Sequence, residues 1–283
     1  MNSKWFKILK IFSKHFRSKP TVAVINLHGV ITTSKGLGRS GLCFESIKGT
    51  IDRAFALPKL SAIALSVNSP GGSPVQSELI YNYIRQLARE KNIQVYSFIE
   101  DVGASGGYWL ACTGDEIYAS SNSIVGSIGV ISAGFGFVDA IRKLGIERRL
   151  YTQGKNKSIL DPFTPEKESD VKIIHSIQRD IHNNFKSLVL TRREQSLKAS
   201  EAVLFNGEFW SGTKALELGL IDRIGDMYTV IKEKYGKHCK IIRINSEKTW
   251  LKRTLGLEVS TENIVANLLT AIEEKVIFSK LGL

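Results

Sequence analysis

Cysteine is scarce in this chain. Cys43, Cys112 and Cys239 lie far apart and form no Cys-x-x-Cys pair. A structural zinc site or the disulfide framework of a small secreted domain needs closely patterned cysteines, so the sequence predicts neither. Low-complexity linkers and short-period repeats are also missing, and 43% of the 283 residues are hydrophobic. That is enough to bury the core of one large domain or two small ones.

A long hydrophobic run is missing from the first 20 residues. The uncharged runs there are at most three residues long, which excludes a signal-peptide core and a spanning helix. This leader carries six cations and no acid, half of the formal net charge of +12, and its aromatic and aliphatic residues alternate with the cations. Such spacing gives a helix one apolar and one basic face. We therefore expect residues 1–20 to contact an anionic membrane surface rather than nucleic acid, and the body to be cytoplasmic or peripheral on the inner membrane, without a cleavable signal peptide.

A second stretch, residues 117–138, is uncharged over 22 positions, long enough to suggest a membrane span. It contains five serines, one asparagine and four glycines. These residues are costly in a lipid-exposed helix but suit buried strands and tight turns. We predict a segment of the protein core.

Short β-branched runs predict buried strands at 21–27, 62–67 and 94–99. Between the last two, Ser73 and Gln76 predict a capping box, and Pro74 suits the first position of a helix. A strand, a helix and a strand in succession indicate a parallel α/β unit. The predicted buried stripe of this helix is Val75, Leu79, Ile80, Tyr83, Ile84 and Leu87.

Further helices are predicted from 109, over 139–144, over 165–195, and after Ser211 up to Gly219. A basic strand at 240–244 and an amphipathic helix near 262–277 follow. We expect a leader over 1–20, one main domain over 21–235, and an extension of unknown role over 236–283.

The most informative local sequence is Gly103-Ala104-Ser105-Gly106-Gly107, where a strand gives way to a helix. Glycines allow a sharp turn that exposes the serine hydroxyl, and the helix start offers free N–H groups. Taken alone, the motif fits a nucleophile and a plain turn equally well.

A second glycine-rich turn, Ser69-Pro70-Gly71-Gly72, follows the strand that ends at Val67. Its N–H groups suit the oxyanion of an acyl-transfer reaction. An ordinary strand-to-helix turn is the alternative.

A serine nucleophile needs a base. None of the five histidines, His15, His28, His175, His182 and His238, stands in a glycine-rich or loop context typical of a triad base. A lysine in an apolar pocket can replace histidine, because desolvation favours its neutral form.

A set of motifs in order along the chain resembles the signal peptide peptidase A family. They are Ser69-Pro70-Gly71-Gly72, Gly103 to Gly107, Gly126-Ser127-Ile128-Gly129, Gly154-Lys155-Asn156-Lys157-Ser158, Asp161-Pro162-Phe163, Trp210-Ser211-Gly212, and Gly219 to Asp222. The set runs from about residue 21 to 235, so chance similarity of separate short motifs is a poor explanation.

The resemblance implies a ClpP/crotonase-like α/β fold and a serine endopeptidase that uses a Ser-Lys dyad and no metal or other cofactor. Ser105 matches the nucleophile, Lys157 the general base in preference to Lys155, Ser127 the hydroxyl that orients the lysine, and Gly72 the backbone donor of the oxyanion hole. The family further implies a ring-shaped homo-oligomer in which serine and lysine meet across a subunit boundary, and hydrophobic or signal-peptide-like peptide substrates. Its usual N-terminal spanning helix is replaced here by the basic leader.

Three alternatives remain. An α/β-hydrolase esterase would use the same serine turn with a downstream acid and histidine. A non-catalytic membrane-associated scaffold would keep the fold. A crotonase-type acyl-CoA enzyme would share the oxyanion hole but leave Ser105 and Lys157 without a role.

Overall fold

The computed structural model of the protein describes residues 19–33 and 41–245. The leader over 1–18 and the helix predicted near 262–277 lie outside these ranges, so both remain predictions.

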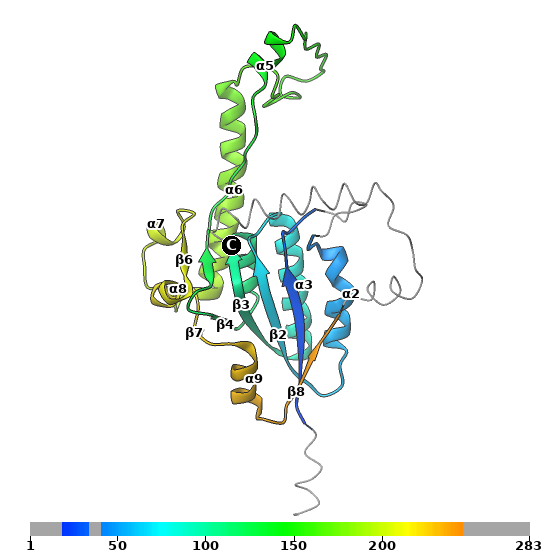
Figure 1. The fold of residues 1–283 in the computed structure, drawn as a ribbon, viewed down its shortest axis with the longest axis vertical. Coiled ribbons are helices and arrows are strands. Elements are labelled where there is room, and N and C mark those ends of the chain that lie inside the picture. The colour runs from blue at the N-terminus through cyan, green and yellow to red at the C-terminus, as the bar shows by residue number, and fades with distance from the viewer. Residues whose placement is uncertain (1–18, 34–40, 246–283) are drawn as a thin grey trace, which may run out of the picture.

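An eight-stranded, mostly parallel sheet forms the centre of the molecule (Figure 1). Its main path runs β6-β5-β3-β2-β1-β8, with β4 beside β3 and β7 beside β4. Of the strand pairs in the described sheet, only β6 with β5 is antiparallel. The strands are β1 (Thr21–His28), β2 (Leu60–Ser69), β3 (Gln94–Ala104), β4 (Glu116–Ala119), β5 (Ile124–Gly126), β6 (Phe209–Ser211), β7 (Arg223–Ile224) and β8 (Lys240–Arg243).

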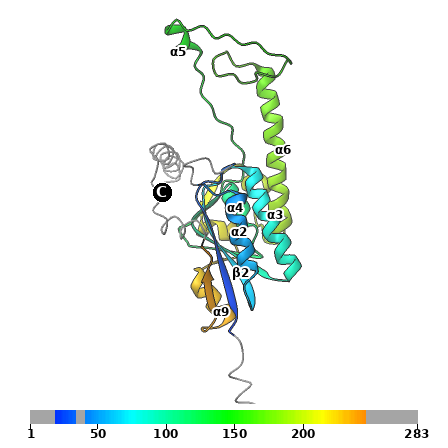
Figure 2. The same ribbon diagram turned by 90° about the vertical axis from the view of Figure 1, so that its right-hand side faces the viewer.

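Helices cover the two faces of the sheet unequally. The helices are α2 (Phe44–Phe55), α3 (Pro74–Lys91), α4 (Gly106–Ala111), α5 (Val138–Lys143), α6 (Glu168–Arg193), α7 (Glu201–Leu204), α8 (Gly212–Leu218) and α9 (Met227–Tyr235). Figure 2 shows α2 and α3 on one side of the sheet and α9 on the other. A hydrophobic core lies on each face of the sheet, and alternate residues of β1 and β2 point into one or the other. Ile25 and Leu65 pack under α2 and α3, whereas Val24 and Ala64 pack with α9.

The predicted strands are confirmed, and β2 and β3 run further than their apolar runs. The strand predicted at 240–244 is confirmed as β8, which pairs with β1 and extends the sheet. The helix predicted after Ser211 is also confirmed, because the Ser211 side chain caps α8 and Gly219 ends it.

Helix α3 differs in two details from its prediction. The Ser73 side chain accepts from the Gln76 N–H, but the Gln76 side chain accepts from the Phe44 N–H at 2.8 Å instead of returning to Ser73. The predicted capping box is therefore only half formed, because Gln76 joins α3 to α2. The predicted stripe is wrong at two positions, since Val75 and Leu79 are exposed while Ile80 and Ile84 are buried.

The largest correction concerns residues 117–138. Apart from an exposed turn at 120–122, the segment packs in the core only as far as Ile128. Beyond it the chain leaves the body, and the side chains of Ile131 and Phe135 are 87% and 82% exposed. Residues 129–167, here called the arm, include α5 and project beyond the sheet at the far end of α6 in both views (Figures 1 and 2). Absence of charge therefore does not mark burial here.

Helix α6 connects the arm to the body. At 26 residues it is about 39 Å long. Its C-terminal half packs on the body through Phe185 and Val189, whereas Ile177 in its first half is exposed. The apolar side chains predicted to be buried on this helix are therefore buried only in part. In the described part of the chain, no helix has the length and apolar character that crossing a membrane requires.

Candidate active site

Ser105 occupies a strained turn between β3 and α4. Its φ of 51° and ψ of −125° are unfavourable for a residue with a side chain, and such strain collects at functional sites. Two sets of hydrogen bonds hold it: the Ser105 N–H donates to the Gly126 carbonyl at 2.8 Å, and the Ser105 carbonyl accepts from Tyr108 and Trp109 at 2.9 and 3.0 Å. The turn thus presents the serine at the start of a helix, the geometry of a nucleophile elbow.

The second glycine turn lies directly against this serine. A Cβ added to Gly71 would lie 2.8 Å from both the Ser105 Cβ and the Gly106 amide nitrogen. The φ of 106° at Gly71 is likewise one that side chains rarely adopt. Glycine is therefore required here both for its conformation and for the close approach of the two turns.

A short extended segment at Ile31 orients the Gly72 amide. The Ile31 N–H donates to the Gly71 carbonyl, and the Ile31 carbonyl accepts from Ser73, both at 2.8 Å. Because successive amides of an extended chain point in opposite directions, the Gly72 N–H faces away from Ile31. Within the described residues, neither the Gly72 nor the Gly106 amide has a hydrogen-bond acceptor. These two donors are available to an oxyanion.

Sequence reasoning named Gly72 but missed Gly106 and Ile31. Gly106 was open to inference, because the residue after a nucleophile at a helix start commonly supplies an oxyanion-hole amide. Ile31 was not, since its pairing with Gly72 joins segments far apart in the sequence.

Ser127 lies beside Ser105 through the register of two parallel strands. Ala104 of β3 pairs with Gly126 of β5, so the two serines occupy equivalent positions just beyond the strand ends. Both have positive φ, 51° at Ser105 and 52° at Ser127, and both are half-buried. The Ser127 N–H donates to the Glu208 carbonyl at 2.7 Å. The fold therefore brings together three of the four predicted site residues.

Lys157 does not join them within one chain. It lies exposed in the arm, near the start of α6, where the Leu160 N–H donates to the Asp170 carboxylate. Phe185 of the same helix stacks on Trp109 of α4, with 5.0 Å between the ring centroids. About 22 Å of helix separates these two contacts, at about 1.5 Å per residue. The arm therefore carries Lys157 away from the serine of its own chain.

The arm has its own internal order. Asp161 accepts from the Phe163 N–H at 3.0 Å and forms an ion pair with Arg148 at 3.1 Å. The Phe163 N–H and then Arg148 lower the pKa of the Asp161 carboxyl below its usual value. The rings of Phe137 and Phe163 lie 5.6 Å apart. These contacts give the segment that holds Lys157 a defined shape outside the body.

Other groups are poor candidates for the chemistry. Among the described residues, no histidine forms a hydrogen bond with Ser105; His28 contacts Ser66 and His175 contacts Gln178. Cys43 and Cys112 are buried, and burial raises the pKa of the Cys112 thiol to about 12, which keeps it protonated.

Comparison with known protein families shows which family the chain belongs to. Residues 87–238, more than half of the chain, match the model of peptidase family S49. The chain belongs to peptidase family S49. The match covers β3, the serine turn, the arm and α6. The resemblance to signal peptide peptidase A relatives is thereby confirmed at the level of the family.

Two curated relatives illustrate the range of this similarity. A protein of Brucella melitensis named Na(+)/H(+) antiporter NhaA is 44% identical over 285 residues, which cover 97% of this chain and 39% of that protein. The chain thus spans well under half the length of this relative. A putative signal peptide peptidase SppA of Enterococcus faecium is 28% identical over 236 residues, covering 79% of this chain and 65% of the relative.

A solved structure confirms the fold of this S49 chain. A mutant of the 1510-N membrane-bound stomatin-specific protease, in complex with a substrate peptide, superposes with a TM-score of 0.52 at 16% sequence identity. The alignment covers 90% of this chain and 99% of that one. The predicted ClpP/crotonase-like α/β fold is therefore confirmed.

The Gly71 contact leads to a first prediction. Gly71→Ala is expected to reduce kcat for a peptide substrate by about a hundredfold, because the new methyl group displaces Ser105 and the Gly106 amide, and a lost oxyanion donor costs about that much. Gly207→Ala is the matched control: Gly207 also has positive φ, 88°, but nothing lies within 4 Å of its added Cβ. Steady-state kinetics and thermal unfolding of both variants check this. Equal loss of kcat in both would contradict a specific contact at Gly71.

Proposed function

We propose that this S49 chain is a serine endopeptidase in which Ser105 is the nucleophile. The observation that carries the proposal is the strained turn that presents Ser105 against two amides, Gly72 and Gly106, that have no acceptor within the described residues. An oxyanion that forms on a peptide carbonyl attacked by Ser105 would accept from both. Membership of a peptidase family supports the same chemistry.

The proposed general base is Lys157 of a second copy of the chain. The arm holds Lys157 away from its own Ser105, and it exposes a set of large apolar side chains that find no cover in the described chain: Ile131, Phe135, Leu144, Ile146 and Tyr151. Exposed apolar side chains in such number favour burial against another protein surface. A ring of copies would bury them and bring each lysine to a neighbour's serine.

The catalytic cycle follows from these positions. Neutral Lys157 accepts the proton of the Ser105 hydroxyl, and the serine oxygen attacks the peptide carbonyl carbon. The tetrahedral oxyanion is bound by the Gly72 and Gly106 amides, and Ser127 accepts or donates a hydrogen bond that orients the lysine amine. Collapse expels the leaving amine with the proton from Lys157. Water then hydrolyses the acyl-enzyme with the same lysine as base. Apart from the substrate and water, the groups that act in these steps are residues of this chain and of its second copy.

The proposed substrates are hydrophobic or signal-peptide-like peptides at a membrane surface. The Enterococcus faecium relative is named a putative signal peptide peptidase, and the Brucella melitensis relative, which matches 97% of this chain, is named as an antiporter. The basic leader over 1–20 is the proposed contact with anionic lipid. The proposed catalytic domain spans 21–235.

A fluorophosphonate probe, which reacts with activated serines, tests the proposed nucleophile. We expect the assembled wild-type protein to be labelled at Ser105, and Ser105→Ala to lose all labelling because no other activated hydroxyl is proposed. Ser97→Ala, which removes a buried serine elsewhere on β3, is the control that keeps labelling. Absence of labelling in the assembled wild type would favour the non-catalytic scaffold. Labelling that depends on His175, His182 or His238 would instead favour the esterase.

A further inference from the structure

The face of the sheet opposite α2 and α3 changes character along its strands. On β1 and β2 this face carries Val24 and Ala64, which pack with α9, and further along the strands it carries Asn26 and Ser66. On β3 the same face changes from Phe98 to Glu100. Polar side chains thus replace apolar ones toward the carboxyl ends of parallel strands, where open α/β sheets bind ligands.

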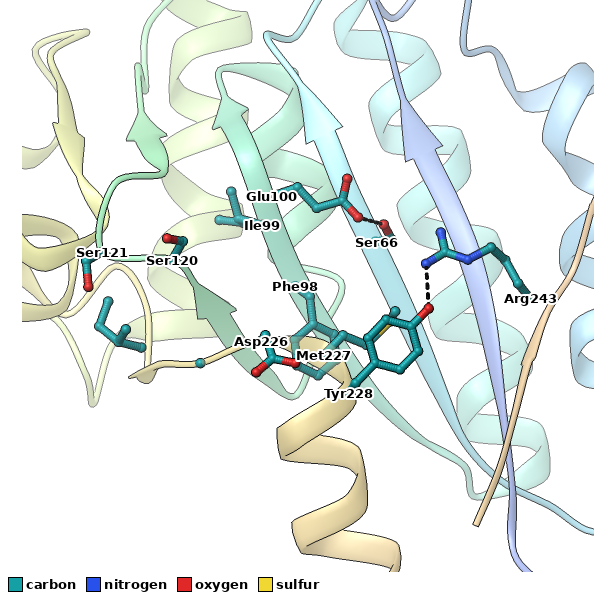
Figure 3. A pocket seen from close by; sticks show the side chains of 12 residues that line it. Ser66, Phe98, Ile99, Glu100, Ser120, Ser121, Asp226, Met227, Tyr228 and Arg243 are labelled. Atoms are coloured by element: carbon teal, nitrogen blue, oxygen red, sulfur yellow. Dashed lines mark hydrogen bonds between the residues drawn. The ribbon is translucent and has the colours of Figure 1, made fainter. Parts of the chain in front are cut away.

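A cavity of about 370 Å³ lies where α9 stops covering this face. Figure 3 shows its lining, which comes from β2, β3, the loop after β4, the segment from β7 to the start of α9, and β8. Phe98 and Met227 give it an apolar floor, and polar or charged groups stand around them. The catalytic serine does not line this cavity. Its volume is at the small end of the range typical of small-molecule sites.

Arg243 lies in this lining without a carboxylate partner among the described residues. Its guanidinium donates to the Asn26 side-chain oxygen at 2.7 Å and to the Tyr228 hydroxyl at 3.3 Å, as the dashed line to Tyr228 in Figure 3 shows. Both acceptors are neutral, so they orient the guanidinium and leave its charge uncompensated. An arginine held in this way suits a ligand carboxylate.

Two carboxylates, those of Asp226 and Glu100, also line the cavity, and only Asp226 caps a helix. Asp226 caps α9 by accepting from the Thr229 N–H at 3.0 Å. Glu100 accepts from the Ser66 hydroxyl and lies 3.4 Å from the His28 ring nitrogen. Glu100 is 40% exposed at its side chain and remains able to bind a ligand cation.

Ser66, His28 and Glu100 do not form a second catalytic triad. The same nitrogen, Nε2 of His28, contacts both the Ser66 hydroxyl at 2.9 Å and the Glu100 carboxylate. A triad needs the serine and the acid on different ring nitrogens. The trio therefore orients Glu100 at the cavity.

We propose that this cavity binds a short apolar peptide of two or three residues, with its ammonium group at Glu100, its carboxylate at Arg243, and its side chains on Phe98 and Met227. The lining supplies one available anion, one available cation and an apolar floor, which is the complement of a zwitterionic peptide. The choice of a peptide over another zwitterion rests on the proposed peptidase function, whose products are such peptides.

Calorimetric titration of the full-length Ser105→Ala protein with the tripeptide Ala-Leu-Ala tests the proposal. We expect saturable binding, weakened about tenfold or more when the peptide is N-acetylated and again when it is C-amidated, because each change removes one charge-assisted hydrogen bond. Glu100→Gln should abolish the effect of acetylation and retain that of amidation. Arg243→Gln should do the reverse. This crossed pattern assigns each terminus to its residue.

Asp101→Asn and Arg223→Gln are the matched controls, because each removes a charge near the cavity but outside its lining, and both should bind like the parent. The proposal is overturned if the tripeptide does not bind, or if blocking either terminus leaves affinity unchanged, or if Glu100→Gln and Arg243→Gln keep both effects. Because Ser105→Ala cannot hydrolyse the peptide, the titration measures binding only. Absence of binding would therefore refute the cavity proposal, whereas absence of probe labelling at Ser105 in the wild type would refute the proposed nucleophile.

Discussion

Lys157→Ala is expected to reduce kcat/KM for a peptide substrate by about 10⁴-fold or more, the loss typical when the base of a nucleophile–base pair is removed. The variant should fold like the wild type, because the Lys157 side chain is exposed in the arm and forms no hydrogen bond or ion pair within the described residues. Steady-state kinetics on a quenched-fluorescence peptide, together with an unfolding curve, measure both properties. The same loss should appear in fluorophosphonate labelling of Ser105.

Two controls separate a base from a nearby positive charge. Lys155→Ala removes a cation two residues away in the same exposed loop and should retain nearly full activity. Lys157→Arg preserves the charge but should be as inactive as the alanine variant, since a guanidinium does not lose its proton at accessible pH. The assignment of Lys157 as the base would be refuted if Lys157→Ala kept full activity. It would also be refuted if Lys155→Ala were inactive while Lys157→Ala was active.

Co-expression of Ser105→Ala with Lys157→Ala is expected to restore activity that neither variant has alone. If each site takes serine from one copy and lysine from the next, random mixing at equal amounts forms about one quarter of the sites with both groups intact. The physical reason is the length of α6, which holds the arm and its lysine beyond the reach of their own serine. Activity of the mixed assembly near about 25% of wild type is the measured quantity.

The double variant, Ser105→Ala with Lys157→Ala, supplies the control for mixing. Its co-expression with either single variant should give no activity, because no pairing then combines an intact serine with an intact lysine. Size-exclusion chromatography with light scattering confirms that the mixed copies assemble. Mixed assemblies that remain as inactive as the single variants would place both groups of the dyad in one chain.

Much of the fold was open to prediction because it depends on local patterns. The strands at β1, β2 and β3 are short β-branched runs, and parallel pairing buries them on both faces, so their patterns have few alternatives. The caps at Ser73 and Ser211 are local hydrogen bonds between residues three apart. Such features require no knowledge of distant segments.

Predictions of burial failed where distant parts of the chain set the outcome. Residues 129–138 are uncharged and the first half of α6 carries apolar residues at helical spacing, as core segments do, yet both extend away from the body. The same holds for Val75 and Leu79 on α3, whose periodicity matches a buried stripe. Periodicity shows which side of a helix is apolar, but only the path of the whole chain decides whether anything covers that side.

The sequence by itself determined the chemical groups of this protein: a serine in a glycine-rich strand-to-helix turn, a glycine turn before α3, a second serine at Gly126-Ser127, and a lysine in the Gly154 to Ser158 loop. Only the tertiary structure decided which of them meet. The register of β3 with β5 sets Ser105 beside Ser127, and the pairing of Ile31 with the Gly71 turn aims the Gly72 amide. The rigid length of α6 keeps Lys157 apart from both. Local residue preferences determine turns and helices, whereas distances between segments far apart in sequence depend on sheet register and helix packing, which arise only when the whole chain folds.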